Sequence, residues 1–458
     1  MLGGFPGLYT SLPEKTGTMD TLTLGALGVT FLIVGLWQRR LARDSDRENR
    51  ARQSEAKARG KDKALAQHPQ IREDLCLGCG SCVAACPEHD VIGLVGGVAR
   101  IIHGSRCVGH GKCAEACPVG AITIGLGDVS RRPDIPVLSP ALETSVPGLY
   151  IAGELGGVSL VRNAVEQGRR AVDDVARRLR EEPAAKAPGV RDLLVVGAGP
   201  AGLSAVFRAA ELGLDCAAIS LEDVGGTVRK YPRRKLTLVQ AVDVPLYGTL
   251  KESEYAKEDL LAMWSEVIAR HGIRFRTGAA LTGVTRRDGH LEAETAAGPV
   301  LARFVILALG RRGSPRKLGV PGEESERVLY ELEDAASLRG QRVLVVGGGD
   351  SAVEAALGLA AQPGNRVALA YRKPDFFRLK SRNEERLRAA VRDGRLSVMM
   401  STEVRAIAPG AVTLSRGGAD EVLPNDWVFV FAGGEPPFPL LQRIGVRFGC
   451  APAEAASA

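Results

Sequence analysis

Two stretches of this chain, residues 192–222 and 341–373, share a pattern that very few folds can accommodate. Each starts as an apolar run, turns through closely spaced glycines into a helix, and returns as a second apolar run. A strand that turns at once into a helix packed against it needs glycine at the turn. The repeat therefore predicts an α/β protein with two Rossmann-like dinucleotide-binding domains.

The first stretch carries the complete fingerprint of such a domain. Its turn has glycine at three positions: Gly197, Gly199 and Gly202. Glu222 ends the second apolar run, twenty positions after the last of these glycines. Amide groups at the start of the helix would hold the pyrophosphate of a dinucleotide, and Glu222 would bind a ribose hydroxyl.

The second stretch differs where the adenosine ribose would lie. Its turn has two glycines and an alanine: Gly347, Gly349 and Ala352. The second apolar run ends in Arg372 and Lys373, without an acidic residue. A basic strand end suits a 2′-phosphate, which favours NADPH over NADH. Arg378 and Lys380, slightly further on, are either phosphate contacts or part of a solvated helix face.

Seven of the nine cysteines lie between residues 76 and 117. The first half of this region has the spacing C-x2-C-x2-C-x3-C-P, with the ligand candidates Cys76, Cys79, Cys82 and Cys86. The second half repeats the spacing with one substitution: Cys107, His110, Cys113 and Cys117. This is the spacing of bacterial two-cluster ferredoxins, in which the fourth cysteine serves the other cluster. It favours a ferredoxin-like α+β module over a zinc site, which usually pairs two C-x2-C units.

Cross-ligation gives the two predicted clusters different ligands. One 4Fe-4S cluster would take Cys76, Cys79, Cys82 and Cys117. The other would take Cys86, Cys107 and Cys113, with His110 or with no fourth protein ligand. Imidazole in place of thiolate raises the potential of an iron–sulfur cluster, so we expect a second cluster of higher potential with His110 as a ligand. A three-iron cluster and a cluster with an open or solvent-filled corner are the alternatives.

Residues 19–37 are almost wholly apolar and would span roughly 28 Å as a helix, close to the thickness of a bilayer core. Six arginines follow within residues 39–52, whereas Lys15 is the only basic side chain before. This charge bias predicts a single-pass anchor in the cell inner membrane, with the catalytic part in the cytoplasm. A cleaved signal peptide is the alternative, but the basic n-region and the small-residue cleavage site are missing.

The two dinucleotide folds in series resemble thioredoxin-reductase-like flavoproteins. Residues 304–310 and 427–437 resemble the strands that close each domain in that family, and residues 225–235 resemble a loop beside the flavin in the bacillithiol-disulfide-reductase and flavin-monooxygenase-like branch. The resemblance covers roughly residues 133–449. It implies FAD in the first fold, with contacts from Gly226 and Thr227, and NAD(P)H in the second.

Two departures from that family matter. The last FAD-binding segment of the family resembles residues 136–179, which here precede the first dinucleotide fold, so the flavoprotein is predicted to be circularly permuted. In this segment Gly153 precedes Glu154, which stands where the family has an aspartate that contacts the flavin. Thioredoxin reductases also carry a C-x-x-C in the second domain, and residues 341–432 contain no cysteine.

These observations predict seven parts in chain order: a tail and transmembrane helix (1–37, the helix at about 19–37), a charged stalk or solvated spacer (38–67), a dicluster ferredoxin-like domain (68–128), the permuted FAD segment (133–182), the FAD domain (190–320), the NAD(P)H domain (321–432), and a return to the FAD domain with a tail (433–458).

The predicted function is oxidoreduction, with electrons passing between NADPH and a one-electron or quinone-type acceptor through FAD and two iron–sulfur clusters. The cofactors carry this chemistry, so no catalytic side chain is named. Ferredoxin, a quinone and a membrane-bound reductase are the candidate partners, and flow from reduced ferredoxin to NADP⁺ is equally allowed. A redox-sensing or electron-transfer subunit without turnover and a flavin monooxygenase are the alternatives. The resemblance allows a homodimer, and the net charge of +7 without a long basic tract argues against nucleic acid.

Overall fold

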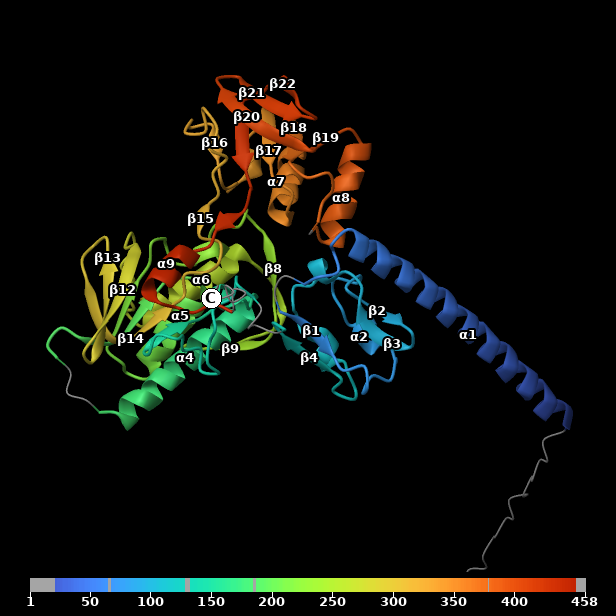
Figure 1. The fold of residues 1–458 in the computed structure, drawn as a ribbon, viewed down its shortest axis with the longest axis horizontal. Helices are drawn as coiled ribbons and strands as arrows, with labels where there is room; N and C mark the ends of the chain where they lie inside the picture. Colours follow the sequence, from blue (N-terminus) through green and yellow to red (C-terminus); the bar gives the residue numbers. More distant parts are fainter. Residues whose placement is uncertain (1–20, 65–66, 128–131, 184–186, 378, 450–458) are drawn as a thin grey trace, which may run out of the picture.

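The computed structural model describes residues 21–64, 67–127, 132–183, 187–377 and 379–449, without the side chains of residues 21–24 and 238. Figure 1 shows two α/β domains, a small domain beside both, and a long helix that projects from the small domain. The predictions for residues 1–20 and for Arg378 concern positions outside the described residues.

The first dinucleotide-binding domain is built on a mixed sheet in the order β12-β13-β14-β6-β7, with β5 also paired to β14. Its strands are β5 (Leu149–Ile151), β6 (Arg191–Val196), β7 (Cys216–Ile219), β12 (Leu281–Arg287), β13 (His290–Thr295) and β14 (Val300–Leu307). Residues 193–196 of β6 are all buried, as expected for a parallel strand covered on both faces. Alternate side chains therefore enter two separate cores, Val195 on one face and Leu194 on the other.

Helices α4 (Val161–Glu181) and α5 (Pro200–Glu211) pack closely together against this sheet. Gly168 of α4 permits the contact, because a Cβ there would lie 2.1 Å from the carbonyl oxygen of Ala201. A smaller layer beside the helices completes the domain: β8 (Leu236–Val239), β9 (Val242–Val244), β10 (Gly248–Leu250), β11 (Ser253–Ala256) and α6 (Lys257–Arg270).

The second dinucleotide-binding domain contains a parallel sheet in the order β16-β23-β17-β18-β19. Its elements are β16 (Val328–Leu329), β17 (Arg342–Val346), α7 (Asp350–Ala360), β18 (Arg366–Tyr371), α8 (Ser381–Arg392), β19 (Leu396–Met400) and β23 (Trp427–Val430). An antiparallel sheet of β20 (Thr402–Ala408), β21 (Ala411–Arg416) and β22 (Ala419–Pro424) covers one side. The chain crosses between the domains at the antiparallel pair β15 (Ser314–Pro315) and β24 (Gly434–Glu435).

Residues 136–179 lie inside the first domain, where they contact segments that are distant in sequence. β5 pairs in parallel with β14, and α4 covers α5. The chain returns to this domain through α9 (Phe438–Ile444) and then runs beside residues 135–137. Two backbone hydrogen bonds join these strands: Val137 donates to Arg447, and Gly449 donates to Ile135. The end of the described chain therefore lies against the start of this segment.

The small domain is a ferredoxin-like α+β module. The module has two antiparallel strand pairs and two short helices. One pair joins β1 (His68–Ile71) to β4 (Ile122–Gly125), and the other is the hairpin of β2 (Ile92–Val95) and β3 (Val98–Ile101). The helices are α2 (Ser81–Ala84) and α3 (Lys112–Glu115). The core of the module is small and includes the buried Cys82 and Cys113 together with four partly buried cysteines: Cys76, Cys86, Cys107 and Cys117.

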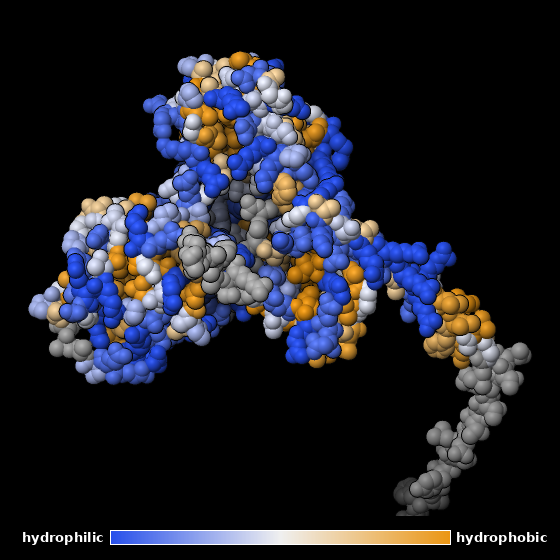
Figure 2. Space-filling model, in the orientation of Figure 1, coloured by the Kyte–Doolittle hydropathy of each residue, from blue (hydrophilic) through white to orange (hydrophobic). Residues whose placement is uncertain are grey.

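Helix α1 (Thr21–Ala58) joins the apolar segment and most of the predicted stalk into one element. Its second half is not a solvated spacer, because Asn49 donates to the carbonyl of Leu94 and Gln53 donates to that of Ile101. Its first half exposes many large apolar side chains, seen at the far end of the helix in Figure 2. In the part of the chain that the structure describes, however, no helix is both long and apolar enough to cross a membrane. The predicted transmembrane helix is therefore not confirmed.

Candidate cofactor sites

Four cysteines line one pocket of the ferredoxin-like module: Cys76, Cys79, Cys82 and Cys117. The first three come from the turn into α2, and the fourth follows α3 in the other half of the motif. Gly78 lets the turn close, since it has φ +65° and a Cβ there would lie 2.1 Å from the carbonyl oxygen of Gly97. The structure thus brings together the four residues predicted to hold the first cluster, one of them across the two halves.

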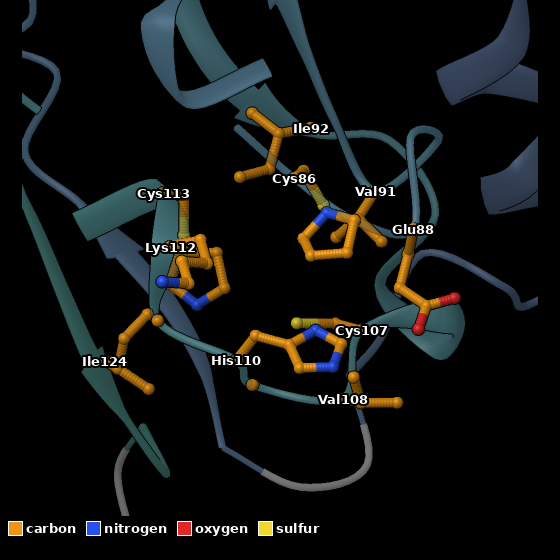
Figure 3. Close-up of a pocket in the computed structure, with 14 residues that line it drawn as sticks. Cys86, Glu88, Val91, Ile92, Cys107, Val108, His110, Lys112, Cys113 and Ile124 are labelled. Atoms are coloured by element: carbon orange, nitrogen blue, oxygen red, sulfur yellow. The ribbon is translucent and has the colours of Figure 1, made fainter. Parts of the chain in front are cut away.

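A second pocket collects the other predicted set: Cys86, Cys107, His110 and Cys113. Figure 3 shows these side chains around one space, with Glu88 at its side. The His110 loop is held by Gln67, whose amide donates to the carbonyl of Gly109 at 2.9 Å. Burial lowers the pKa of His110, so its imidazole is neutral at pH 7 and has a lone pair available for a metal.

Burial raises the pKa of several thiols in the two pockets. Desolvation raises the pKa of Cys82, Cys86 and Cys107, and it raises that of Cys113 to about 11. Cys79 differs, because its hydrogen bond to Ser81 lowers its pKa. Iron binds thiolates, so loading these pockets must release protons. Among the described residues, no three such side chains are grouped tightly enough to hold a single metal ion.

The glycine turn after β6 has the shape that a dinucleotide needs. A Cβ at Gly202 would lie 1.8 Å from the carbonyl oxygen of Gly197, so α5 can approach the strand only because this residue lacks a side chain. Gly199 is different, because a Cβ there would meet no protein atom within 4 Å. The turn therefore leaves open space at the N-terminus of α5, where backbone amides can hold a pyrophosphate.

Two other segments converge on that turn. A Cβ at Gly226 would lie 3.0 Å from Cα of Gly199, which places the loop containing Thr227 against it. A Cβ at Gly153 would lie 3.1 Å from Cβ of Ala201, which brings the preceding segment to the start of α5. These contacts bring together the residues that the sequence assigns to FAD.

Two acids beside this site have basic neighbours. Desolvation raises the pKa of Glu154, while Arg311 and Arg312 act in the opposite direction. Sequence reasoning did not single out these two arginines, which follow the strand β14 by a few residues. Glu222 accepts a hydrogen bond from Lys230, so a ribose hydroxyl would have to share or replace that contact.

The second glycine turn is also closely packed. A Cβ at Gly347 would lie 2.5 Å from the carbonyl oxygen of Phe431, and Ala352 approaches Gly347 closely at the third position. A Cβ at Gly349 would meet nothing within 4 Å. Beyond the turn, Arg372 and Lys373 are exposed at the end of β18. The turn and the basic residues thus lie at the same edge of the sheet, as a dinucleotide site requires.

Lys380, for which the sequence left a phosphate contact and a solvated helix face open, makes a contact that neither prediction named. It precedes α8, its backbone amide donates to Asp350 at 3.1 Å, and its Nζ lies 3.6 Å from Glu88 of the ferredoxin-like module. It therefore belongs to a contact between domains, which sequence spacing could not show.

The module contacts both dinucleotide-binding domains through charged side chains. Arg106 donates to Glu384 at 2.5 Å and to Ser381 at 3.2 Å in the second domain. Lys112 donates to Glu252 at 2.9 Å in the first domain. Both contacts flank the pocket that holds His110, so this pocket, rather than the one holding Cys79, lies on the side toward the dinucleotide domains.

Comparisons with known proteins agree with this architecture. Residues 194–450 match the family model described as pyridine nucleotide-disulphide oxidoreductase, and residues 68–118 match the model described as 4Fe-4S dicluster domain. The first match begins after the segment 136–179.

Named relatives are similar over the same region. A ferredoxin–NADP reductase of Ignicoccus hospitalis is 33% identical over 54% of this chain and 78% of its own length. One of Thermus thermophilus is 34% identical over 47% of this chain and 63% of its own length. Among solved structures, a bacillithiol disulfide reductase of Staphylococcus aureus is 25% identical, with a TM-score of 0.50, over 56% of this chain and 80% of its own.

Proposed function

The chain belongs to the pyridine nucleotide-disulphide oxidoreductase family and carries a 4Fe-4S dicluster domain, and from this premise we propose that it exchanges electrons between NADP(H) and a ferredoxin-type one-electron carrier. It is an NAD(P)H-dependent flavoprotein oxidoreductase with FAD and a 4Fe-4S cluster. The observation that carries the proposal is the presence of two thiol-lined pockets in the same chain as two dinucleotide folds.

The side chains of each site suit a different part of this task. When bound, the flavin exchanges a hydride with the nicotinamide and single electrons with iron–sulfur clusters. The glycine turns at Gly199 and Gly349 hold the pyrophosphates, and the thiols of the module hold iron. The module contacts both dinucleotide domains, which places its two pockets beside them.

A second cluster, with His110 as its fourth ligand, is part of the proposal. Its support is the pocket in which His110 faces the same space as Cys86, Cys107 and Cys113. The lowered pKa of His110 keeps the ring neutral, which is the form that binds a metal.

A ferredoxin-type partner is favoured over the other acceptors. The relatives at 33% and 34% identity are named for ferredoxin and NADP. The second domain cannot carry out dithiol chemistry, because residues 341–432 contain no cysteine. No relative reported above supports a quinone as acceptor. Electron flow in either direction uses the same sites, and the reduction potentials of the cofactors determine the direction.

The test is anaerobic addition of NADPH to the purified holoprotein, followed by the visible spectrum and low-temperature EPR. We expect the flavin absorbance to bleach and cluster signals to appear. Bleaching without cluster signals would indicate that electrons flow in the opposite direction, from ferredoxin to NADP⁺. Reduced ferredoxin and NADP⁺ should then yield NADPH. A protein that reduces no one-electron acceptor with NADPH, and forms no NADPH from reduced ferredoxin, would be a redox sensor instead.

We also propose that the flavoprotein part is circularly permuted relative to its family. The support is the pairing of β5 with β14, the packing of α4 on α5, and the two hydrogen bonds that join residues 135–137 to residues 447–449. A chain cut after residue 128 and closed between 449 and 133 by a short linker should still bind FAD. Loss of FAD binding in that chain would contradict the proposal.

Membrane attachment through residues 19–37 is a further part of the proposal. The support is the exposed apolar half of α1, which includes Phe31 and Trp37, followed by arginines. Flotation with anionic vesicles should carry the full chain but not a chain that starts at residue 45. Equal flotation of both would reject this attachment.

A further inference from the structure

The loop after β18 begins at the second dinucleotide site and also contacts the ferredoxin-like module. At its start, Arg372 and Lys373 are exposed, and within the described residues neither forms an ion pair. Lys373 instead lies over the ring of Phe377, with Nζ 4.3 Å from the ring centroid. Three positions after Arg372 the loop carries an acid, Asp375, which is unfavourable beside a bound phosphate.

Asp375 is neutralised from outside its own domain. Nζ of Lys61 lies 3.0 Å from its carboxylate, and Nη1 of Arg59 lies 3.4 Å from the same oxygen. Lys61 is only 13% exposed, whereas Arg59 is 55% exposed, so solvent screens Lys61 less and Lys61 is the stronger partner. Burial raises the pKa of Asp375, but the hydrogen bond and charge of Lys61, the backbone amide of Phe376 and the charge of Arg59 together outweigh burial and lower this pKa.

The ferredoxin-like module holds Lys61 in this position. The carbonyl of Lys61 accepts a hydrogen bond from the backbone amide of Ser105 at 2.9 Å. The hydroxyl of the same Ser105 donates to the carbonyl of Phe377 at 3.1 Å. Lys61 therefore reaches Asp375 only while the module is docked on this loop.

We propose that Lys61 is a positioning residue for NADPH, which completes the 2′-phosphate site by neutralising Asp375 beside Arg372 and Lys373. The inference rests on the proposed use of NADPH. It means that selection of NADPH over NADH is shared between the second dinucleotide domain and the module, and that undocking the module lowers affinity for the 2′-phosphate.

The expected direction of the change in NADP⁺ affinity follows from the charges on the loop. With Lys61 in place, Asp375 is paired and the two basic residues face the phosphate without opposition. Without Lys61, a carboxylate only partly compensated by the exposed Arg59 remains near the phosphate. NADP⁺ should lose affinity while NAD⁺, which lacks that phosphate, should not.

The experiment is calorimetric titration of the holoprotein with NADP⁺ and with NAD⁺. For Lys61→Ala we expect NADP⁺ binding about three- to fivefold weaker at low salt, the size expected for one charge at a partly exposed site, with NAD⁺ binding unchanged. Added salt should shrink the difference. Lys61→Arg should restore binding, and Lys61→Ala combined with Asp375→Asn should restore it too, because the opposing charge is gone.

Lys63→Ala is the matched control, since Lys63 is exposed and forms no ion pair within the described residues. It should leave both affinities unchanged. Equal weakening of NADP⁺ and NAD⁺ by Lys61→Ala, or no rescue by Asp375→Asn, would overturn the inference while leaving the proposed function intact. If the unmodified protein binds neither nucleotide, the proposed function itself fails.

Discussion

At the scale of single residues, His110 decides what the second pocket can hold. His110→Cys supplies a fourth thiolate, which donates more charge to iron than imidazole does. We expect the potential of the second cluster to fall by on the order of 100 mV or more. An EPR-monitored redox titration measures it, and the first cluster in the same sample is the control. An unchanged potential would favour a three-iron cluster or an open corner.

Two glycines of the first turn offer a paired test of fold against ligand. Gly202→Ala places a methyl 1.8 Å from the carbonyl oxygen of Gly197, so we expect destabilisation of about 1–3 kcal/mol. Gly199→Ala meets no protein atom, so we expect unchanged stability without FAD but at least tenfold weaker FAD binding. Thermal unfolding of the flavin-free protein and flavin retention on gel filtration measure the two effects. Equal losses of stability in the two variants would contradict the assignment of Gly202 to helix packing and of Gly199 to FAD binding.

Residue spacing predicted which of these side chains share a pocket, and for a physical reason. Short cysteine spacings leave a chain few ways to wrap a cluster, so the exchange of Cys86 and Cys117 between halves follows from the spacing. Their role as ligands stays a prediction. Arg311, Arg312 and the Glu222–Lys230 contact could not be found this way, because they depend on loops brought together only by the folded sheet.

At the scale of elements, a buried carboxylate shapes the crossover between the dinucleotide domains. Glu323 accepts hydrogen bonds from the amides of Leu318 and Gly319 and from the hydroxyl of Tyr330. Burial alone would raise the pKa of Glu323, but these hydrogen bonds outweigh it and hold the pKa below its usual value. Its stabilising effect is therefore complete above pH 4.5 and is lost as the pH falls through the lower, folded-state pKa.

Glu323→Gln should remove much of this effect. The amide has one acceptor oxygen for three donors, so we expect destabilisation of about 1–3 kcal/mol at pH 7 and a weaker loss on acidification than in the unmodified protein. Denaturant unfolding at pH 7 and pH 4 measures both. Glu324→Gln is the control, because Glu324 is exposed and its ion pair among the described residues is with the exposed Lys317, at 2.6 Å. Equal effects of the two changes would contradict this role.

Helix α1 shows the limit of sequence reasoning for elements. No proline interrupts residues 21–58, which allows one long helix, but the charged composition of its second half predicted a spacer. Asp46, Asn49 and Gln53 instead satisfy backbone groups of the β2–β3 hairpin. Polar side chains that pair with a distant hairpin have the same composition as solvated ones, so the sequence cannot distinguish them.

At the scale of the whole molecule, Arg106 is the main link between module and second domain. It is 16% exposed and binds Asp90, Ser381 and Glu384. Arg106→Ala leaves two poorly solvated carboxylates without this partner, so we expect about 2–4 kcal/mol of lost docking energy. Faster hydrogen exchange in residues 379–392 and in the module should report it.

Arg388→Ala is the matched control, because Arg388 binds the same Glu384 at 2.6 Å but is 70% exposed. Its loss should cost at most about 1 kcal/mol. If exchange is as slow in Arg106→Ala as in Arg388→Ala, the interface does not depend on this arginine.

The two α/β domains and the ferredoxin module were predictable from local signals: glycine turns, strand-like runs and cysteine spacing. How the three parts dock was not, since docking rests on ion pairs between residues hundreds of positions apart, such as Lys61 and Asp375. Such pairs leave no periodic pattern in a sequence.

The early position of β5 and α4 has a consequence for biosynthesis. All eight candidate iron ligands are translated by residue 117, and the short-range contacts of the module can form as it leaves the ribosome. β5 must wait for β14, and residues 135–137 must wait for residues 447–449, almost the last described part of the chain. Maturation should thus proceed with iron first and flavin last, and a ribosome stalled midway would display a complete iron centre attached to an unfinished enzyme.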